Sequence, residues 1–306
     1  MNETNAPLVS IRCITYNHEK YIRDTLEGFV MQKTNFKFEA IVHDDASTDN
    51  TAAIIQEYAE KYPDIIKPIF ETENQYSKHD GSLQKIMNDA IHPNAKYIAY
   101  CEGDDYWTDP NKLQMQVDLM ERNPKCSLCY HACKNLFEGI STSSFHFGES
   151  VKDSYQLPDM LNYHFQTATI MIKKEVLFCD LYNKALSTGC ASGDVMLFMT
   201  AASIGNLIGI NKQMSVYRRH QNGISNTIKS KNFLYNNYVS WIKVGKVFKG
   251  DIQKHLIKYE LKSYIAKSIL EYKDVKLFIR MICHGLINCP LSVFYAFKNI
   301  ARSYLK

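Results

Sequence analysis

Short apolar runs and amphipathic stretches alternate along the first hundred residues. The apolar runs are rich in Val, Ile, Tyr and Phe and are bounded by polar residues, which is typical of buried strands. The stretches between them have apolar side chains three and four positions apart, which indicates helices. The predicted strands are residues 8–15, 38–43, 65–70 and 97–101. The predicted helices are residues 21–32, a segment around 54–58, and residues 83–90.

This alternation predicts an α/β fold with a mostly parallel sheet and helices on both faces. In such sheets ligands bind at the carboxyl ends of the strands. Polar clusters follow three of the predicted strands, at residues 15–17, at Asp44 and Asp45, and at residues 102–105. We therefore expect these three segments to converge although they are far apart in the sequence. The chain contains no Gly-x-Gly-x-x-Gly or Walker loop, which argues against dinucleotide oxidoreductases and phosphate-loop ATPases.

Residues 228–306 differ from the rest of the chain in net charge and in the pattern of apolar and basic residues. Residues 1–227 hold 21 Lys and Arg and 28 Asp and Glu, a net charge of −7, whereas residues 228–306 hold 15 and 4, a net charge of +11. We therefore predict a catalytic domain at 1–227 and a basic, amphipathic helical region at 228–306. Its most apolar part, residues 277–297, is interrupted by Arg280 and Pro290, which favours a helix on a surface over a membrane span.

The cysteines indicate a reducing compartment. Their number, nine, is odd, and most lie inside apolar segments. Residues 1–7 are polar and do not resemble an export signal, so we expect a cytoplasmic protein. The spacing of Cys126, Cys129, His131 and Cys133 raises a zinc site as an alternative, but a second ligand pair is missing and the alternating apolar pattern favours a buried strand.

Asp104 and Asp105 form the most informative polar pair. Two adjacent carboxylates after a buried strand repel each other and need a cation or strong donors to stay ionised. Oxygen ligands suit Mn²⁺ or Mg²⁺, and these ions keep positions open for diphosphate oxygens. Helix capping by Thr108 or Asp109 before the helix predicted at 112–121 leaves the two preceding acids unexplained.

Three segments, in order, resemble family-two glycosyltransferases, which are inverting enzymes of the GT-A nucleotide-diphospho-sugar transferase fold. The segments are Val9 to Asn17, Ile41 to Thr51 and Tyr97 to Trp107. Each segment alone is a weak signal, but the ordered set is specific. The resemblance covers roughly residues 8–225, and the basic region lies outside it.

The resemblance implies a role for each residue of the donor pocket. Thr15 and Tyr16 would line the nucleotide pocket, with Tyr16 against the base. Asp45 would accept a hydrogen bond from a uracil ring, with Asp44 beside it. Glu102 stands where many members have Asp, so its part in donor binding is open.

The resemblance also implies the groups that face the diphosphate. Asp104 would face the ribose or the metal, and Asp105 would face the metal. The resemblance does not decide which of the two binds the ion directly. His220 would bind the metal or a phosphate, and Arg218 would neutralise the leaving group. Many members have an Arg near residues 81–88; here Lys78 or Lys85 could replace it, or both could be solvated surface charges.

Residues 188–198 resemble the family's loop-to-helix segment that supplies the catalytic base. Asp194 is the candidate for that role, because an inverting transfer needs one carboxylate to take the acceptor's proton. The alternative from local sequence is a plain N-cap of the helix predicted at 195–202.

These residues predict an enzyme that transfers a sugar from a uridine diphosphate donor to a glycan or lipid-linked acceptor of a bacterial cell-surface polysaccharide or lipopolysaccharide. A sugar-phosphate nucleotidyltransferase is one alternative, but residues 15–19 lack the glycine-rich loop that it needs. A non-catalytic binding protein is another alternative. The presence of Asp104, Asp105 and Asp194 favours an enzyme over it. We expect residues 228–306 to contact an anionic membrane surface, placing the protein peripherally on the inner membrane, and we expect no nucleic acid partner.

Overall fold

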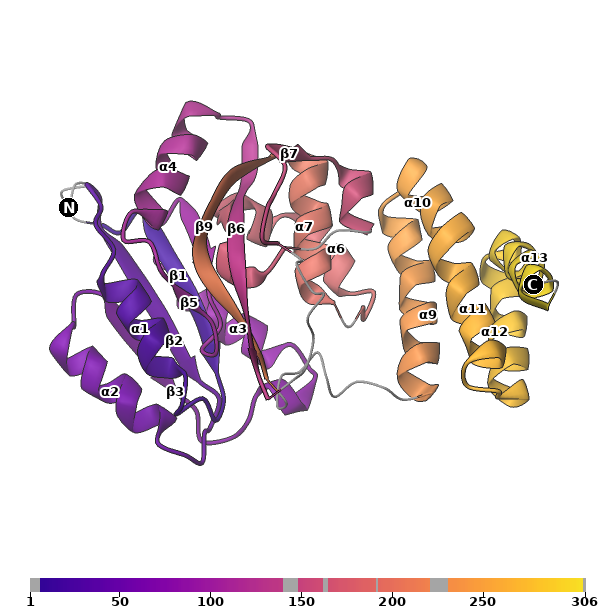
Figure 1. Ribbon diagram of the computed structural model, residues 1–306, viewed down its shortest axis with the longest axis horizontal. Helices are drawn as coiled ribbons and strands as arrows, with labels where there is room; N and C mark the ends of the chain where they lie inside the picture. The colour runs from indigo at the N-terminus through magenta and orange to yellow at the C-terminus, as the bar shows by residue number, and fades with distance from the viewer. Residues whose placement is uncertain (1–5, 140–147, 162–164, 191, 221–230, 305–306) are drawn as a thin grey trace. The chain divides into compact units, whose positions relative to one another are not determined.

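The computed structural model describes residues 6–139, 148–161, 165–190, 192–220 and 231–304 (Figure 1). The chain forms two compact units. The first comprises residues 1–155, 165–177 and 204–221, and the second comprises residues 156–164, 178–203 and 222–306. The predicted domain boundary at 227 and 228 lies outside the described residues. Besides the basic helical region, the second unit contains residues 156–164 and 178–203, which come earlier in the chain.

A nine-stranded sheet forms the first unit, in the order β3-β2-β1-β4-β8-β6-β9-β5 with β7 pairing beside β9. The half from β3 to β4 is parallel throughout, as the alternation of strands and helices predicts. β1, β2 and β4 are buried over nearly their whole length, where helices pack on the sheet (Figure 1). The bounds are Val9–Thr15 for β1, Phe38–Asp44 for β2, Ile66–Phe70 for β3 and Tyr97–Tyr100 for β4.

The other half of the sheet mixes strand directions. β8 pairs antiparallel with both β4 and β6, while the two long strands β6 and β9 run parallel with irregular register. β5 is a two-residue strand that exists through its pairing with β9. The sheet is thus mixed rather than uniformly parallel. The bounds are Tyr106–Trp107 for β5, Cys126–Glu138 for β6, Ser154–Tyr155 for β7, Met171–Lys173 for β8 and Asn206–His220 for β9.

The helices of the first unit pack apolar faces on this sheet. Leu26 and Phe29 of α1 enter the same core as the strand residues, and Leu113 does so from α4. α1 lies so close to β5 that a Cβ on Gly28 would be 2.9 Å from the backbone nitrogen of Trp107. The bounds are Ile22–Val30 for α1, Thr51–Lys61 for α2, Tyr76–Lys78 for η2, Ser82–Asp89 for α3, Lys112–Arg122 for α4, Thr167–Thr169 for η4 and Lys174–Phe178 for α5.

The second unit is helical and has a core of its own. Tyr238 of α9, Ile265 of α11 and Met281 of α12 are fully buried in it. α6 packs on α9, where the Ser240 hydroxyl donates a hydrogen bond to the Gly189 carbonyl at 3.0 Å. The bounds are Leu157–Leu161 for η3, Asp180–Leu186 for α6, Gly193–Ile204 for α7, Lys231–Val247 for α9, Asp251–His255 for α10, Leu256–Glu260 for η5, Leu261–Leu270 for α11, Val275–Asn288 for α12 and Pro290–Tyr304 for α13.

Candidate active site

The ends of β1, β2 and β4 bring three polar segments to one edge of the sheet. Thr15 is the register partner of Asp44, and its carbonyl accepts a hydrogen bond from the Asp45 amide at 2.9 Å. On the other side of β1, the Gly103 amide donates to the Ile14 carbonyl at 3.0 Å. The convergence expected from the sequence is therefore present, and backbone hydrogen bonds fix it.

Asp44 and Asp45 are both buried at the end of β2 but have different partners. The carboxylate of Asp45 accepts hydrogen bonds from the backbone amides of Gln75 at 2.7 Å and Tyr76 at 3.0 Å. Asp44 accepts one from the Ser47 amide at 3.1 Å, while its Oδ1 is buried without a hydrogen-bond partner. Asp45 thus anchors the loop that follows β3, and Asp44 keeps an unused acceptor.

Gly103 allows the closest approach in this site. A Cβ there would lie 2.6 Å from the Thr15 Cβ and 2.9 Å from the His18 Nδ1, so no other residue fits without displacing them. Thr15 Oγ1 and His18 Nδ1 are buried without hydrogen-bond partners, like Asp44 Oδ1. Buried polar atoms are rarely unpaired in folded proteins, and they concentrate where a ligand or water completes the structure. Tyr16, between them in sequence, is 45% exposed.

Asp104 pairs with His220 across the site. The His220 Nε2 lies 3.1 Å from the Asp104 Oδ2. Burial opposes ionisation, yet the hydrogen bond with His220 and the electrostatic influence of His18 lower the pKa of Asp104 below its ordinary value. Burial lowers the pKa of His18 as well, although the charge of Asp104 acts in the opposite direction. Asp104 is therefore an ionised carboxylate beside two imidazoles.

Asp105 has the opposite electrostatic character. Its Oδ1 accepts a hydrogen bond from the Arg218 amide at 2.8 Å, and its backbone carbonyl accepts one from the Thr25 hydroxyl at 2.6 Å. Burial and the negative charge of Asp104 raise its pKa well above the ordinary value, more than the Arg218 amide offsets. The two neighbouring carboxyl groups thus differ in acidity, and the positive charge of Arg218 only partly offsets the rise in the pKa of Asp105.

Arg218 is almost fully enclosed, with 6% of its surface exposed. One guanidinium nitrogen donates to the Asp104 carbonyl at 3.0 Å, and another forms an ion pair with Asp24. The guanidinium lies over the rings of Tyr21 at 5.1 Å and Tyr106 at 4.5 Å from their centroids. These contacts hold the turn that carries Asp104 and Asp105. A role of Arg218 toward a leaving group stays a prediction.

The remaining candidates lie around this cluster. Glu102 accepts a hydrogen bond from the Ile14 amide at 3.3 Å, which ties the β4 turn to β1. Lys78 pairs with Glu73, and Lys85 pairs with Asp89 within α3. Both lysines therefore have acidic partners on the surface of the protein.

Three residues of the cluster were not predicted from the sequence. His18, Tyr21 and Asp24 come from the start of α1 and the loop before it, and the ring centroids of Tyr21 and His220 are 4.9 Å apart. The only signal in the sequence was the place of His18 just after the first predicted strand. Residues 221–225, which belong to the motif around His220, lie outside the described residues.

Asp194 belongs to the second unit and so is not among the residues that the first unit brings together. It is exposed, in the first turn of α7, and its Oδ1 accepts a hydrogen bond from the Val195 amide at 2.9 Å. A carboxylate at a helix N-terminus is stabilised by the unpaired amides there. α7 begins at Gly193, so Asp194 lies within its first turn and does not precede the helix as an N-cap, and its catalytic role stays a prediction.

Comparison with known proteins identifies a matching family and similar sequences. Residues 10–179 match the model of Glycosyl transferase family 2. An uncharacterized protein of Mycobacterium bovis is 35% identical over 71% of this chain, which spans 60% of that relative. The dTDP-rhamnosyl transferase RfbG of Shigella flexneri is 26% identical over 68% of this chain and 71% of its own.

Solved structures show the same fold. S. aureus TarS in complex with UDP-GlcNAc has a TM-score of 0.62 at 15% identity, covering 90% of this chain and 79% of that one. The mannosyltransferase PcManGT from Pyrobaculum calidifontis, in complex with GDP-Man and Mn²⁺, has a TM-score of 0.55 at 16% identity, covering 99% and 82%. The predicted GT-A fold with a C-terminal helical region is confirmed.

Proposed function

The chain belongs to glycosyl transferase family 2, and we propose that it transfers a sugar from a nucleoside diphosphate donor to an acceptor hydroxyl with inversion at the anomeric carbon. The observation that carries this proposal is the adjacent Asp104 and Asp105 at the carboxyl end of β4, where the pKa of Asp104 is lowered and the pKa of the buried Asp105 is raised. Sheets of this kind bind ligands at that edge.

The donor nucleotide is proposed to bind at the carboxyl ends of β1 and β2, in contact with Thr15, Tyr16, Asp44, Asp45 and Glu102. The unpaired Asp44 Oδ1 and Thr15 Oγ1 support this, because a bound nucleoside offers donors and acceptors for both. Asp45 already has two backbone donors, so it would act on the base with its remaining lone pairs. UDP is the proposed nucleotide; the TarS complex holds UDP-GlcNAc, and RfbG is named for dTDP-rhamnose, another pyrimidine nucleotide sugar.

A divalent metal, Mn²⁺ or Mg²⁺, is proposed to bind at Asp104, Asp105 and His220. Among the residues that the structure describes, no three His, Cys, Asp or Glu side chains are grouped closely enough to hold an ion by themselves. Ions of this kind need only one or two carboxylates when diphosphate oxygens supply further ligands. The ionised Asp104 and the adjacent carboxyl group of Asp105, whose negative charge a cation would stabilise, fit that requirement. When bound, the metal would stabilise charge that grows on the departing diphosphate.

Asp194 is proposed as the catalytic base. Its exposed carboxylate can accept a proton from an acceptor hydroxyl, and the hydrogen bond with the Val195 amide fixes its position at the start of α7. The acceptor is proposed to be a glycan or a lipid-linked glycan of a bacterial cell-surface polysaccharide or lipopolysaccharide. The enzyme would then work in the cytoplasm or peripherally on the inner membrane.

Release of nucleoside diphosphate from a panel of nucleotide sugars tests the proposal. The full-length protein, Mn²⁺ and each donor are incubated without acceptor, and UDP formation by slow donor hydrolysis is measured. We expect hydrolysis of at least one UDP-sugar, and loss of it in Asp104→Asn. A binding protein that only kept the fold would bind a donor without hydrolysing it, and a nucleotidyltransferase would instead release pyrophosphate from a nucleoside triphosphate and a sugar phosphate.

A further inference from the structure

The helices α12 and α13 expose an unusual number of large apolar side chains. Ile287 is 84% exposed and Phe294 is 64% exposed. Across the described residues, seven of the thirteen exposed large apolar side chains lie on these two helices. The seven are Val275, Ile279, Leu286, Ile287, Leu291, Phe294 and Phe297. Exposed apolar residues scattered singly are ordinary in soluble proteins, but a cluster of this size marks an interaction site.

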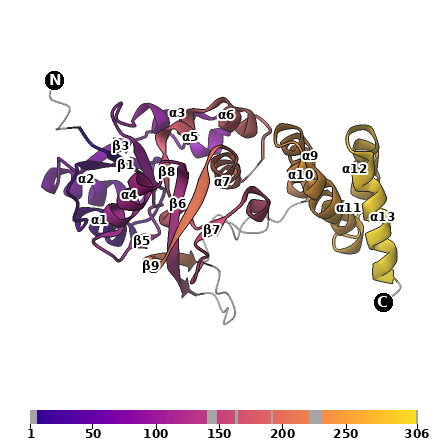
Figure 2. The ribbon, with the colours of Figure 1, turned by 90° about the horizontal axis from the view of Figure 1, so that it is seen from above.

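The same helices also bury apolar faces in the core of the second unit. Met281 of α12 and Val293 of α13 are inside it, and the rings of Phe278 and Phe297 lie 6.1 Å apart between the two helices. Figure 2 shows α12 and α13 together at one end of the helical bundle. A helix that is apolar on two sides requires a second apolar environment besides the core. The outward side therefore needs an occupant.

Basic residues continue the apolar stripe of α13. Leu291, Phe294, Lys298 and Arg302 are all exposed and are spaced at i, i+3, i+7 and i+11, so they share one face of the helix. Its first half is apolar and its second half is cationic.

Lys298 and Arg302 also line a groove of about 270 Å³ that Lys258 and Lys262 line from the neighbouring helices. Tyr259 and Tyr295 complete its walls. Four cationic side chains therefore surround one groove next to the apolar cluster.

We propose that this α12–α13 face, defined as the seven apolar residues together with Lys258, Lys262, Lys298 and Arg302, docks on the surface of an anionic phospholipid bilayer. The apolar side chains enter the boundary between headgroups and acyl chains, and the four basic side chains bind lipid phosphates. This combination of an apolar face and flanking Lys and Arg is the chemistry that an anionic lipid interface selects. Among the described residues no helix is long and apolar enough to cross a membrane, so the contact is with the surface.

Charge argues against a second copy of the chain as the occupant. Residues 231–304 carry 13 Lys and Arg and 4 Asp and Glu, a net charge of +9. Two such faces brought together would repel each other, whereas an anionic bilayer neutralises them. A lipid surface therefore satisfies both the apolar and the charged parts of this face.

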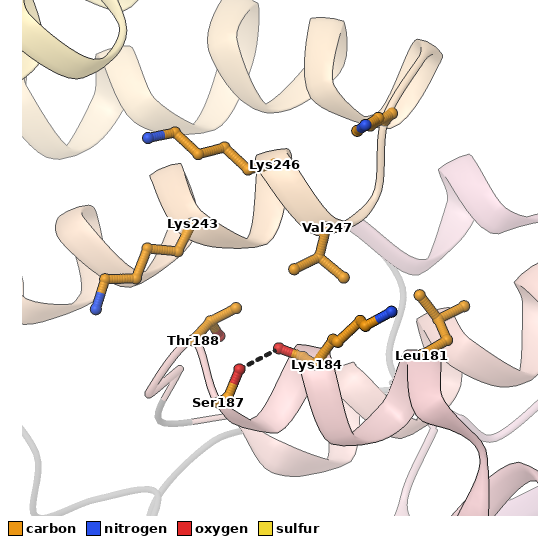
Figure 3. A pocket seen from close by; sticks show the side chains of 8 residues that line it. Leu181, Lys184, Ser187, Thr188, Lys243, Lys246 and Val247 are labelled. Carbon is orange, nitrogen blue, oxygen red and sulfur yellow. Dashed lines mark hydrogen bonds between the residues drawn. The ribbon is translucent and has the colours of Figure 1, made fainter.

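A second basic region of the same unit provides the control. A pocket of about 510 Å³ between α6 and α9 is lined by Lys184, Lys243, Lys246 and Lys249. Figure 3 shows Lys243 and Lys246 extending to one side and Lys184 to the other, so these ammonium groups do not converge on one point. Lys243 and Lys246 carry the same charge as Lys298 and Arg302 but have no comparable apolar cluster beside them.

The experiment is co-sedimentation of the full-length protein with vesicles of phosphatidylcholine alone or mixed with phosphatidylglycerol, at low and high salt. We expect binding to the mixed vesicles only, weakened by salt. Lys298→Gln with Arg302→Gln should lower the partition coefficient about 30-fold, since each basic residue near an anionic surface contributes roughly 1 kcal/mol. Ile287→Ser with Phe294→Ser should lower it at least about tenfold, because both side chains are exposed and their loss leaves the core intact.

Matched variants decide whether this face is responsible. Lys243→Gln with Lys246→Gln removes the same charge. Phe70→Ser with Ile204→Ser removes two large apolar side chains of the first unit that are 43% and 45% exposed. Both pairs should bind nearly as the wild type does. The proposal is overturned if the wild type stays in the supernatant with mixed vesicles at low salt, or if Lys243→Gln with Lys246→Gln weakens binding as much as the α13 pair. It is also overturned if Ile287→Ser with Phe294→Ser converts a dimer to a monomer in sedimentation velocity without vesicles.

This inference does not depend on the proposed function. Donor hydrolysis measured without vesicles should be the same in the Ile287→Ser, Phe294→Ser double variant as in the wild type. Failure of vesicle binding and failure of donor hydrolysis are therefore separate results.

Discussion

Asp105 is a carboxyl group buried where its ionised form is costly. Burial and the neighbouring Asp104 raise its pKa, and the backbone amide of Arg218 donates a hydrogen bond to its side chain. An asparagine can accept the same hydrogen bond through its own Oδ1 and carries no charge. Replacing Asp105 with Asn therefore distinguishes a structural role of this side chain from a role in binding a cation.

Asp105→Asn should keep the fold and lose the metal. We expect a melting temperature equal to or above that of the wild type, because the variant removes a carboxyl group whose ionisation is costly in this buried position. We also expect at least about a tenfold loss of Mn²⁺-dependent UDP affinity. Thermal unfolding and calorimetric titration measure the two effects. A stable variant that binds UDP with Mn²⁺ as tightly as the wild type would remove Asp105 from the metal site.

Asp194→Asn should act on the chemical step alone. Loss of a general base typically lowers kcat by about 10² to 10⁴, while UDP affinity should change less than about twofold because the base does not contact the nucleotide. The matched control is Asp180→Asn, another exposed Asp in the first turn of a helix of the same unit, which should leave both values unchanged. Equal loss of binding and turnover in Asp194→Asn would assign the residue to the donor pocket.

At the scale of elements, α4 begins with a fully buried cation. Lys112 has no exposed surface, and its ammonium nitrogen lies 3.6 Å from the centroid of the Trp107 ring in β5 without a hydrogen-bond partner. The π face of Trp107 gives partial compensation, but burial still lowers the pKa of Lys112 to about 7. The junction of β5 and α4 thus contains a group whose charge opposes folding.

Lys112→Met should stabilise the protein below pH 7 and remove a pH dependence. Because the folded pKa is below the unfolded one, the unfolded state binds more protons between about pH 7 and 10.5, so wild-type stability rises with pH across that window. The penalty at lower pH is on the order of a few kcal/mol. Melting temperatures of both proteins from pH 6 to 9 test this; a difference that stays constant across the range would contradict it.

The sequence predicts the elements that are buried on both faces better than those defined by pairing. β1 and β2 match the predicted strands closely, since apolar residues such as Val9, Ile11 and Val42 recur along them and are buried. β5 has two residues and depends on its pairing with β9. β9 has fifteen residues, but the polar Lys212 and Gln213 interrupt its apolar pattern, so the sequence does not indicate one long strand. β5 and β9 form because of strand pairing in the folded protein, which cannot be predicted from the local sequence pattern.

The site shows the same limit. Asp104, His220 and Arg218 were identified through motifs, and the structure brings them together. Asp24 was not, because an exposed Asp in the first turn of a helix is an ordinary feature of helix N-termini. Its ion pair with Arg218 joins residues 194 positions apart, and only the folded chain places them side by side. The enclosure of Arg218 likewise became visible only in the structure.

At the scale of the whole molecule, the basic region does more than follow the catalytic part in sequence. The second unit joins residues 178–203 with the helices from α9 onward. α6 packs on α9, and the Ser240 hydroxyl contacts the Gly189 carbonyl five residues before Asp194. The predicted catalytic base thus lies in a segment that the C-terminal helices support.

A chain ending at Thr227 should therefore be less stable than the full-length protein. Removing α9 exposes the face of α6 that it covers, and we expect a fall in melting temperature of about 5 °C or more, or aggregation. Differential scanning calorimetry of the two chains measures it. An unchanged melting temperature would support the division of the chain at residue 227 into two independent parts.

Calorimetric titration of UDP into the full-length protein, first with Mn²⁺ and then with EDTA, tests the proposed metal-dependent nucleotide site most directly. The carboxylates of Asp104 and Asp105 at the end of β4 would repel a diphosphate unless a cation binds there as well. We predict clear binding with Mn²⁺ and a loss of at least about a hundredfold in affinity with EDTA. Equal affinity in both conditions, or no binding of UDP in either, would contradict a metal-dependent site for a uridine diphosphate donor.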